Sequence, residues 1–176
     1  MKHYLEEEFF VRNADSSDVP LYAQMLRDEK WLMNSGFEKS EFENDEQIKK
    51  FLSKNHPDDI RWVCFHETKG FMGFVHFKVV SDEYIVTIGG IVPTFLNSGL
   101  GIKYFVECID LYYKLGNQRT LRHNIYQENL RSCKMHLGMG DELVDLRIFD
   151  NKKVDVFETN KTSFYNSHLV KRILKL

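Results

Sequence analysis

Cysteine is scarce in this sequence, and its placement excludes two kinds of stabilisation. The only cysteines among the 176 residues are Cys64, Cys108 and Cys133. They are odd in number, far apart, and without the paired spacing of zinc ligands. We therefore expect neither a disulfide framework nor a metal site, and interpret the three as reduced thiols that pack in the fold or lie at its surface.

Long apolar runs are also missing, and proline is rare. A membrane-spanning helix needs about 18 consecutive apolar residues, and no stretch of this sequence approaches that length. The first ten residues, MKHYLEEEFF, lack the apolar segment of a signal peptide. Three prolines, with no repeat or low-complexity tract, leave no obvious linker. We therefore expect a cytoplasmic protein with no membrane partner, folded as a single domain over residues 1–176.

An excess of charge of one sign is the third absence. The 24 lysines and arginines nearly balance the 26 aspartates and glutamates, for a formal net charge of -2. Proteins that neutralise nucleic-acid phosphates concentrate basic side chains, so a nucleic-acid partner is not expected. The basic residues of the tail, Lys171, Arg172 and Lys175, are interpreted as a solvated face rather than a binding arm.

The chain is 43% apolar and 14% aromatic, and its apolar residues form strand-like runs in some segments and recur at helical spacing in others. Runs rich in β-branched and aromatic residues predict strands over 9–14, 61–67, 71–80, 83–92, 119–127 and a hairpin of 142–150 and 152–160 around Asn151. Helical spacing predicts helices over 19–32, 46–55, 101–116 and 128–140, and a short one within 162–176. Short polar turns join the second, third and fourth strands into a meander.

Two glycines, Gly99 and Gly101, separate the strand over 83–92 from the helix over 101–116. The first N–H groups of a helix lack intrahelical partners, and glycines allow a phosphate to approach them closely. The turn lacks the Lys-Ser/Thr ending of a nucleotide P-loop, and Tyr104 replaces the third glycine of a dinucleotide-binding motif. The pattern predicts either an anion site of another kind or simply the loose turn that a helix start needs.

The strand that precedes this turn ends in IGGIVP, residues 88–93. Proline cannot donate to a sheet, and glycines within a strand mark a bulge or the close approach of another backbone. We expect this strand end to lose its pairing with a neighbour, so that an extended ligand with amide groups can bind its backbone. The strand end and the glycine turn together require a ligand with amides at one end and phosphates at the other, and coenzyme A (CoA) is such a molecule.

Three segments carry a family resemblance: residues 91–101 (IVPTFLNSGLG), the helix over 101–116, and residues 129–139 (NLRSCKMHLGM) after the strand 119–127. The chain resembles the GNAT superfamily of acyl-CoA acyltransferases over about residues 9 to 160. The resemblance implies an α+β (mixed α/β) fold with a mostly antiparallel, twisted sheet of about six to seven strands, flanked by helices and splayed at the acyl-CoA site. It implies an N-acetyltransferase that uses acetyl-CoA as cosubstrate and needs no metal.

The resemblance also implies the residues that bind the cofactor. The backbone of Ile91 and Val92 would bond the acyl-pantetheine arm, and amides from Asn97 to Gly101 would hold the pyrophosphate. Asn129 and Ser132 match an Asn-x-x-Ala/Ser motif at the start of the next helix. The implied cofactor positions are therefore Ile91, Val92, Asn97, Ser98, Gly99, Leu100, Gly101, Asn129 and Ser132.

Three departures from the family pattern affect the chemistry. Leu96 stands where the family has an arginine or glutamine, which removes a side-chain contact with the cofactor. Thr87 stands where many members have a glutamate as general base. The segment after Asn129 is two residues shorter than usual, and a gapless alignment places His136 at the position of the tyrosine that protonates the departing thiolate.

The general base is therefore open. A lysine-like amine with a pKa near 10.4 is neutral about once in a few thousand molecules at pH 7, and its deprotonation costs roughly 4–5 kcal/mol. Candidates are His123, Tyr126 and Glu128. Strand alternation places His123 on one face with Leu121 and Ile125, which equally suits a half-buried structural histidine.

The acceptor amine is not identified by the sequence. We expect it to contact the first two helices and their loop through Trp31 and Phe37, together with Thr87 and Tyr126, although Trp31 also suits ordinary core packing. A small-molecule amine, such as an amino sugar, is the preferred acceptor. Alternatives are a protein N-terminus or lysine, a catalytically degenerate CoA-binding or regulatory module, and a domain that only binds another protein. The resemblance adds a homodimer as one expected assembly.

Overall fold

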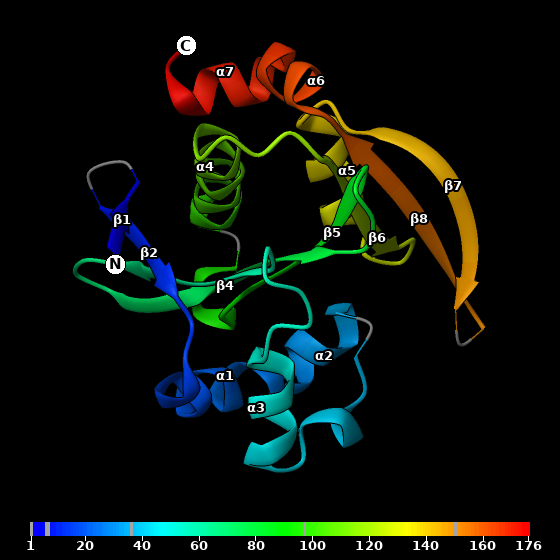
Figure 1. Ribbon diagram of the computed structural model, residues 1–176. Helices are drawn as coiled ribbons and strands as arrows, with labels where there is room; N and C mark the ends of the chain where they lie inside the picture. Colours follow the sequence, from blue (N-terminus) through cyan, green and yellow to red (C-terminus); the bar gives the residue numbers. More distant parts are fainter. Residues whose placement is uncertain (1, 6–7, 36, 97, 150) are drawn as a thin grey trace. The chain divides into compact units, whose positions relative to one another are not determined.

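The computed structural model describes residues 2–5, 8–35, 37–96, 98–149 and 151–176, and its strands form one eight-stranded sheet. The strand order is β1-β2-β3-β4-β5-β6-β8-β7 (Figure 1). The strands are β1 Lys2–Tyr4, β2 Phe9–Asn13, β3 Ile60–His66, β4 Gly70–Val79, β5 Tyr84–Ile91, β6 Thr120–Tyr126, β7 Glu142–Phe149 and β8 Lys152–Thr159. The helices are α1 Val19–Leu26, α2 Glu29–Ser35, α3 Asp45–Leu52, α4 Leu100–Lys114, α5 Leu130–Gly138, α6 Lys161–Asn166 and α7 His168–Leu174.

The mixed α/β class and the mostly antiparallel sheet confirm the predicted fold, with one strand more than expected. The additional strand is β1, which pairs antiparallel with β2. Its three residues, Lys-His-Tyr, show neither the apolar run nor the alternation by which a strand is recognised in a sequence. Among the described residues, no helix is long and apolar enough to cross a membrane. The cysteines form no disulfide, and Cys64 and Cys108 are buried.

The chain divides into two compact units. Unit 1 comprises Met1–Lys78 and Ile88–Phe105, and unit 2 comprises Val79–Thr87 and Val106–Leu176. Strand β5 and helix α4 contribute residues to both units. The single domain expected over residues 1–176 stays a prediction.

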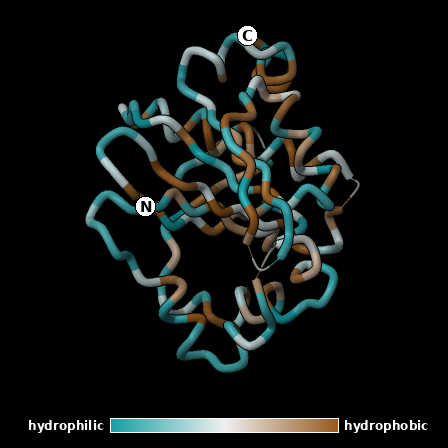
Figure 2. Tube along the Cα trace, turned by 90° about the vertical axis from the view of Figure 1, so that its right-hand side faces the viewer, coloured by the Kyte–Doolittle hydropathy of each residue, from teal (hydrophilic) through white to brown (hydrophobic). Residues whose placement is uncertain are grey.

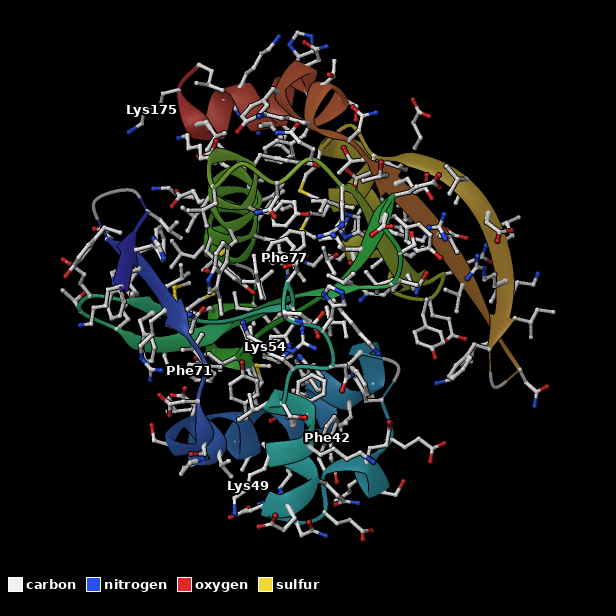
Figure 3. All side chains as sticks on the ribbon, viewed as in Figure 1. Phe42, Lys49, Lys54, Phe71, Phe77 and Lys175 are labelled. Carbon is white, nitrogen blue, oxygen red and sulfur yellow. The ribbon has the colours of Figure 1, made fainter. Side chains whose placement is uncertain are left out.

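Unit 1 has an aromatic core under its helices. Phe51 of α3 meets Phe42 and Phe74 edge-on, with ring centroids 5.4 and 5.6 Å apart, and Phe42 is labelled in Figure 3. Tyr22 of α1 stacks on Phe74 of β4 at 5.0 Å. Ile48, one turn before Phe51, is fully buried, as its place on the apolar face of α3 predicts. These contacts fix α1 and α3 on the strands of their unit.

The helix predicted over 19–32 is two helices, α1 and α2, because the chain breaks at Arg27 and Asp28. Asp28 Oδ1 accepts the N–H of Trp31 at 3.0 Å and so caps the start of α2. The apolar periodicity runs on across this break, so it could not reveal the cap. The tail likewise forms two helices, α6 and α7, because the hydroxyl of Ser167 caps α7.

Unit 2 confirms the predicted hairpin of β7 and β8, whose apolar and polar residues can be followed along the coloured trace of Figure 2. Asn151 has φ +61° in the turn between the two strands, a conformation that asparagine adopts more readily than most residues. β8 is largely buried where it pairs with β6 and β7, whereas β7 is exposed over its whole length. Since β7 is the last strand in the order, its outer edge has no strand partner among the described residues.

Candidate functional site

The second half of β5 has an edge that β6 leaves unpaired. The parallel pairs between β5 and β6 begin with Tyr84 and Thr120 and end with Val86 and Arg122, although β5 continues to Ile91. This confirms the predicted loss of pairing at the strand end. Among the described residues, the edge that β6 leaves unpaired is therefore that of residues 88–91, which lie in unit 1.

The other edge of this strand end is held within unit 1. The N–H of Val92 donates to the carbonyl oxygen of Met72 at 2.8 Å, and the carbonyl oxygen of Val92 accepts the N–H of Phe95 at 3.0 Å. A cofactor contact from the Val92 backbone would therefore have to use the second lone pair of its carbonyl oxygen. The predicted roles of Ile91 and Val92 stay predictions.

The glycines of β5 are required by close packing, as the sequence suggests. A Cβ on Gly90 would lie 2.6 Å from Met25 Cε and 2.7 Å from Trp31 Nε1. The carbonyl oxygen of Gly90 accepts the hydroxyl of Tyr104 at 2.7 Å, and a Cβ on Gly73 would lie only 2.0 Å from that oxygen. The glycines thus let β4, α1 and the start of α4 approach the strand end that precedes the turn.

The glycine turn, residues 98–101, leaves two backbone N–H groups at the start of α4 without an acceptor among the described residues. Gly99 has φ +79°, a conformation that favours glycine, and α4 begins at Leu100. Among the described residues, the N–H groups of Gly99 and Gly101 have no acceptor. Those of Leu100 and Ser98 are bonded within unit 1, to Ser98 Oγ at 3.2 Å and to the carbonyl oxygen of Phe95 at 3.3 Å. The turn thus offers two of the predicted donors without rearrangement.

The remaining predicted cofactor residues lie elsewhere. Asn97 falls outside the described residues. Asn129 and Ser132 belong to unit 2, where Asn129 Oδ1 accepts the N–H of Ser132 at 3.1 Å and caps α5. This side chain supports the start of the helix, and its contact with a cofactor stays a prediction.

A buried network of four side chains, Thr87, His123, His136 and Asp141, lies in unit 2. Thr87 Oγ1 is hydrogen-bonded to His123 Nδ1. The pair meets because β5 and β6 run parallel in register up to Val86 and Arg122, so that the next residue of each strand points to the same face. Thr87 and His123 are 8% and 1% exposed, so both lie away from water.

Helix α5 brings the other two members together through the way it ends. Gly140 has φ +86° and donates its N–H to Leu137, and the N–H of Asp141 returns to the carbonyl oxygen of His136 at 3.1 Å. This is a Schellman motif, in which the second residue after the helix turns back on its last turn. The Asp141 carboxylate is thereby placed 2.6 Å from His136 Nδ1 and 3.5 Å from His123 Nε2.

Burial determines the electrostatics of the network. It lowers the pKa of His123 well below the usual value, and the nearby His136 lowers it further. Burial also raises the pKa of Tyr113, with additions from Tyr112 and Asp141. At neutral pH His123 is therefore a neutral imidazole, with one ring nitrogen as donor and the other as acceptor.

The network resembles a three-ligand metal site in composition, since His123, His136 and Asp141 offer ligand atoms within 4.8 Å of one another. Two ligands of a tetrahedral zinc lie about 3.3 Å apart. His136 Nδ1 and Asp141 Oδ2 are closer, at 2.6 Å, which is a hydrogen-bond distance. We therefore interpret the contact between His136 and Asp141 as a hydrogen bond rather than as two ligands of one metal ion.

The predicted acceptor residues are divided between the units. Trp31 and Phe37 stack with centroids 5.8 Å apart in unit 1, where Trp31 is 8% exposed and belongs to the aromatic core. Thr87 bonds His123 in unit 2, and Tyr126, half-buried at the end of β6, lies under the ammonium group of Lys152. Packing accounts for Trp31, and the role of all four residues in binding an acceptor stays a prediction.

Sequence reasoning missed Asp141, which joins the two histidines. The available signal was Gly140, since a glycine just after a helix indicates a left-handed cap that turns the chain back. The pattern singled out His136 and His123 separately, and only the contacts show that their rings lie 4.3 Å apart.

Comparison with known proteins gives matches in structure but not in sequence. No protein-family model and no curated protein matches the chain. A spermidine N-acetyltransferase from Vibrio cholerae, in complex with CoA and spermine, is similar with a TM-score of 0.80 and 12% identity, over 92% of this chain and 100% of that one. An uncharacterised Bacillus halodurans protein is similar with a TM-score of 0.80 and 10% identity, over 99% and 96%. A ribosomal L7/L12 alpha-N-protein acetyltransferase in complex with CoA is similar with a TM-score of 0.77 and 15% identity, over 91% and 98%.

These similarities define the class of fold. The chain has the fold of the GNAT superfamily, as its sequence motifs predict. At identities of 10 to 15% the comparisons concern the fold alone, and function has to be argued from the site.

Proposed function

We propose that the protein is an N-acetyltransferase that transfers an acetyl group from acetyl-CoA to a primary amine of a small molecule, by direct attack in a ternary complex. The observation that carries this proposal is the open edge of β5 at residues 88–91, followed directly by the N–H groups of Gly99 and Gly101. The strand edge suits the amides of a pantetheine arm, and the helix start suits a diphosphate. The cytoplasmic location expected from the sequence remains part of the proposal.

His136 is proposed as the general acid that protonates the departing thiolate. Its Nδ1 faces Asp141, so Nε2 is the nitrogen from which the proton would leave. If His136→Ala acetylates within about threefold of the wild-type rate, the assignment is wrong, because general acid catalysis contributes about 100-fold or more.

A small-molecule amine is the proposed acceptor, and a protein N-terminus is the second candidate. The similar structures include a spermidine N-acetyltransferase and an alpha-N-protein acetyltransferase. An amine panel for this protein should therefore contain a polyamine, an amino sugar, a lysine peptide and a peptide with a free N-terminus.

Two measurements test the proposal in sequence. Thermal unfolding with acetyl-CoA tests binding, since a ligand at 100 times its dissociation constant stabilises by about 2.7 kcal/mol. Release of free thiol from acetyl-CoA with each amine then tests turnover. Stabilisation without thiol release would indicate a degenerate CoA-binding module, and no stabilisation would indicate a GNAT fold used only for protein binding.

We also propose that two copies of the chain pair through β7. Its outer edge lacks a strand partner in the described sheet, and Leu146 and Ile148 are 64% and 77% exposed. An antiparallel pair centred on Leu146 would set Asp145 of each copy opposite Arg147 of the other, and Leu146 opposite its own copy. Opposite charges and apolar residues at facing positions stabilise strand pairs, so the β7 sequence is complementary to itself.

The pairing is tested by Leu146→Lys, which puts two like charges face to face at the centre of the proposed interface. Analytical ultracentrifugation should find a dimer for the wild type and a monomer for this variant. Leu115→Lys, at a side chain 51% exposed just after α4, is the control and should remain dimeric. A monomeric wild type, or a dimer that survives Leu146→Lys, would contradict the pairing.

A further inference from the structure

We propose that Tyr104 is a positioning residue that holds the end of β5 in a fixed place relative to the glycine turn, so that both can bind one CoA molecule. The Tyr104 hydroxyl donates to the carbonyl oxygen of Gly90 at 2.7 Å. The role rests on the proposed acetyltransferase function. Tyr104, Gly90 and the glycine turn all lie in unit 1.

The place of Tyr104 on α4 explains why its hydroxyl reaches the strand. α4 begins at Leu100, so Tyr104 lies one helical turn after the start. Side chains on a helix lean toward its N-terminus and cover the preceding turn. The Tyr104 side chain is buried, with the residue 3% exposed, and its hydroxyl meets the strand end that precedes the turn. One directional contact thus joins the start of the helix to the end of the strand.

The hydrogen bond uses a carbonyl that points away from the unpaired edge of β5. Along a strand, the N–H and C=O groups of successive residues point to alternate sides. The N–H of Val92 donates to Met72 of β4, so the groups of Gly90 point to the β4 side as well. Those of Gly89 and Ile91 point to the other side, where β6 leaves the strand unpaired. Tyr104 therefore fixes the strand end without occupying the groups that a pantetheine arm would bond.

A second contact between the turn and the strand end is apolar. A Cβ on Gly101 would lie 2.8 Å from Ile91 Cδ1, so the two residues pack closely. Apolar packing limits how near the two segments come but has no preferred direction, whereas a hydrogen bond has one. A ligand that binds at two places gains affinity when both are already held at the matching separation. The Tyr104 hydroxyl supplies that preorganisation.

Titration of Tyr104→Phe with CoA and with ADP tests this role. Phenylalanine keeps the ring and removes the hydroxyl, and we expect the dissociation constant of CoA to rise about tenfold, which is about 1.4 kcal/mol and within the net contribution of one hydrogen bond. ADP has a diphosphate but no pantetheine arm, so its dissociation constant should stay within about threefold of the wild-type value. A purely structural role would lower the melting temperature and leave both constants unchanged.

Tyr113→Phe is the matched control on the same helix. Tyr113 is 1% exposed, and its hydroxyl donates to the carbonyl oxygen of Thr159 at 3.4 Å, in unit 2. This variant also loses a buried hydroxyl that bonds a strand carbonyl, and it should bind CoA and ADP as the wild type does. Calorimetric titration gives the constants, and thermal unfolding without ligand verifies that each variant is folded.

Proton NMR of the wild type tests the hydrogen bond without any variant. The Tyr104 hydroxyl proton should exchange slowly with water both in the free protein and with CoA bound. A hydroxyl proton that becomes observable only with CoA would show that the bond is not formed in advance, and would overturn the preorganisation.

The titrations separate failure of this role from failure of the proposed function. For Tyr104→Phe, a CoA constant within about twofold of the wild type, or an equal rise for CoA and ADP, overturns the role of Tyr104 alone. A wild type that binds CoA but not ADP shows that the turn does not hold a diphosphate by itself, and overturns the coupling of two sites. A wild type that binds no CoA overturns the proposed function and the role of Tyr104 with it.

Discussion

Replacing Gly101 by proline removes one backbone N–H from the glycine turn and should weaken CoA binding selectively. Gly101 is the second residue of α4, in the first turn, where proline is tolerated, and its N–H has no acceptor among the described residues. A hydrogen bond to a charged group contributes about 1.5–3 kcal/mol. At about 1.4 kcal/mol per factor of ten, the dissociation constant of CoA should rise about 10- to 140-fold.

Gly101→Ala is the matched control for this experiment. It adds the same Cβ, which would lie 2.8 Å from the flexible end of Ile91 at Cδ1, but it keeps the N–H. Calorimetric titration with CoA compares the two variants, and thermal unfolding without ligand verifies that both are folded. If Gly101→Pro binds CoA within about threefold of Gly101→Ala, the backbone N–H does not hold the diphosphate and the reasoning is refuted.

Two further predictions concern stability. Gly90→Ala should lower the free energy of unfolding by about 1–3 kcal/mol, because its Cβ would lie 2.6 Å from Met25 Cε and 2.7 Å from Trp31 Nε1. The melting temperature should fall by about 2–4 °C for each kcal/mol lost. An unchanged midpoint of urea unfolding would contradict this packing. His76 is buried, its Nε2 lies 2.8 Å from the Tyr22 hydroxyl, and burial lowers its pKa well below 6.5. Because the unfolded chain then binds the proton first, stability should be lost as pH falls below about 6.5, by about 1.4 kcal/mol per pH unit from this histidine. His76→Gln should reduce that slope, and equal slopes between pH 7 and 5.5 would show that His76 is not responsible.

Local pattern was sufficient for most elements of this fold. The strand over 83–92 and the helix over 101–116 appear as β5 and α4 with small changes at their ends, because their apolar spacing and bounding glycines act within one segment. The pattern of apolar residues did not predict an element whose bounds or existence depend on a single contact. The break before α2 depends on the Asp28 cap, and β1 depends on pairing with β2.

The candidate site divides in the same way. The turn around Gly99 and Gly101 was recognisable, since the need for a positive φ and for unbonded N–H groups is imposed by neighbouring residues. The carboxylate that lies between the two histidines could not be recognised from the sequence. Asp141 meets His136 through a helix cap and lies 3.5 Å from His123 Nε2 of β6, a residue 18 positions earlier in the chain.

The sequence by itself determined the order of most strands and helices, the glycine turn and the resemblance that predicted the fold, because each depends on residues close together in the chain. Only the tertiary structure decided which polar groups are bonded and which are open. It showed that Leu100 is already bonded to Ser98, and that Thr87, His123, His136 and Asp141 form one network. The physical reason is that hydrogen bonds and charge interactions act over a few ångströms in space, whatever the distance along the chain.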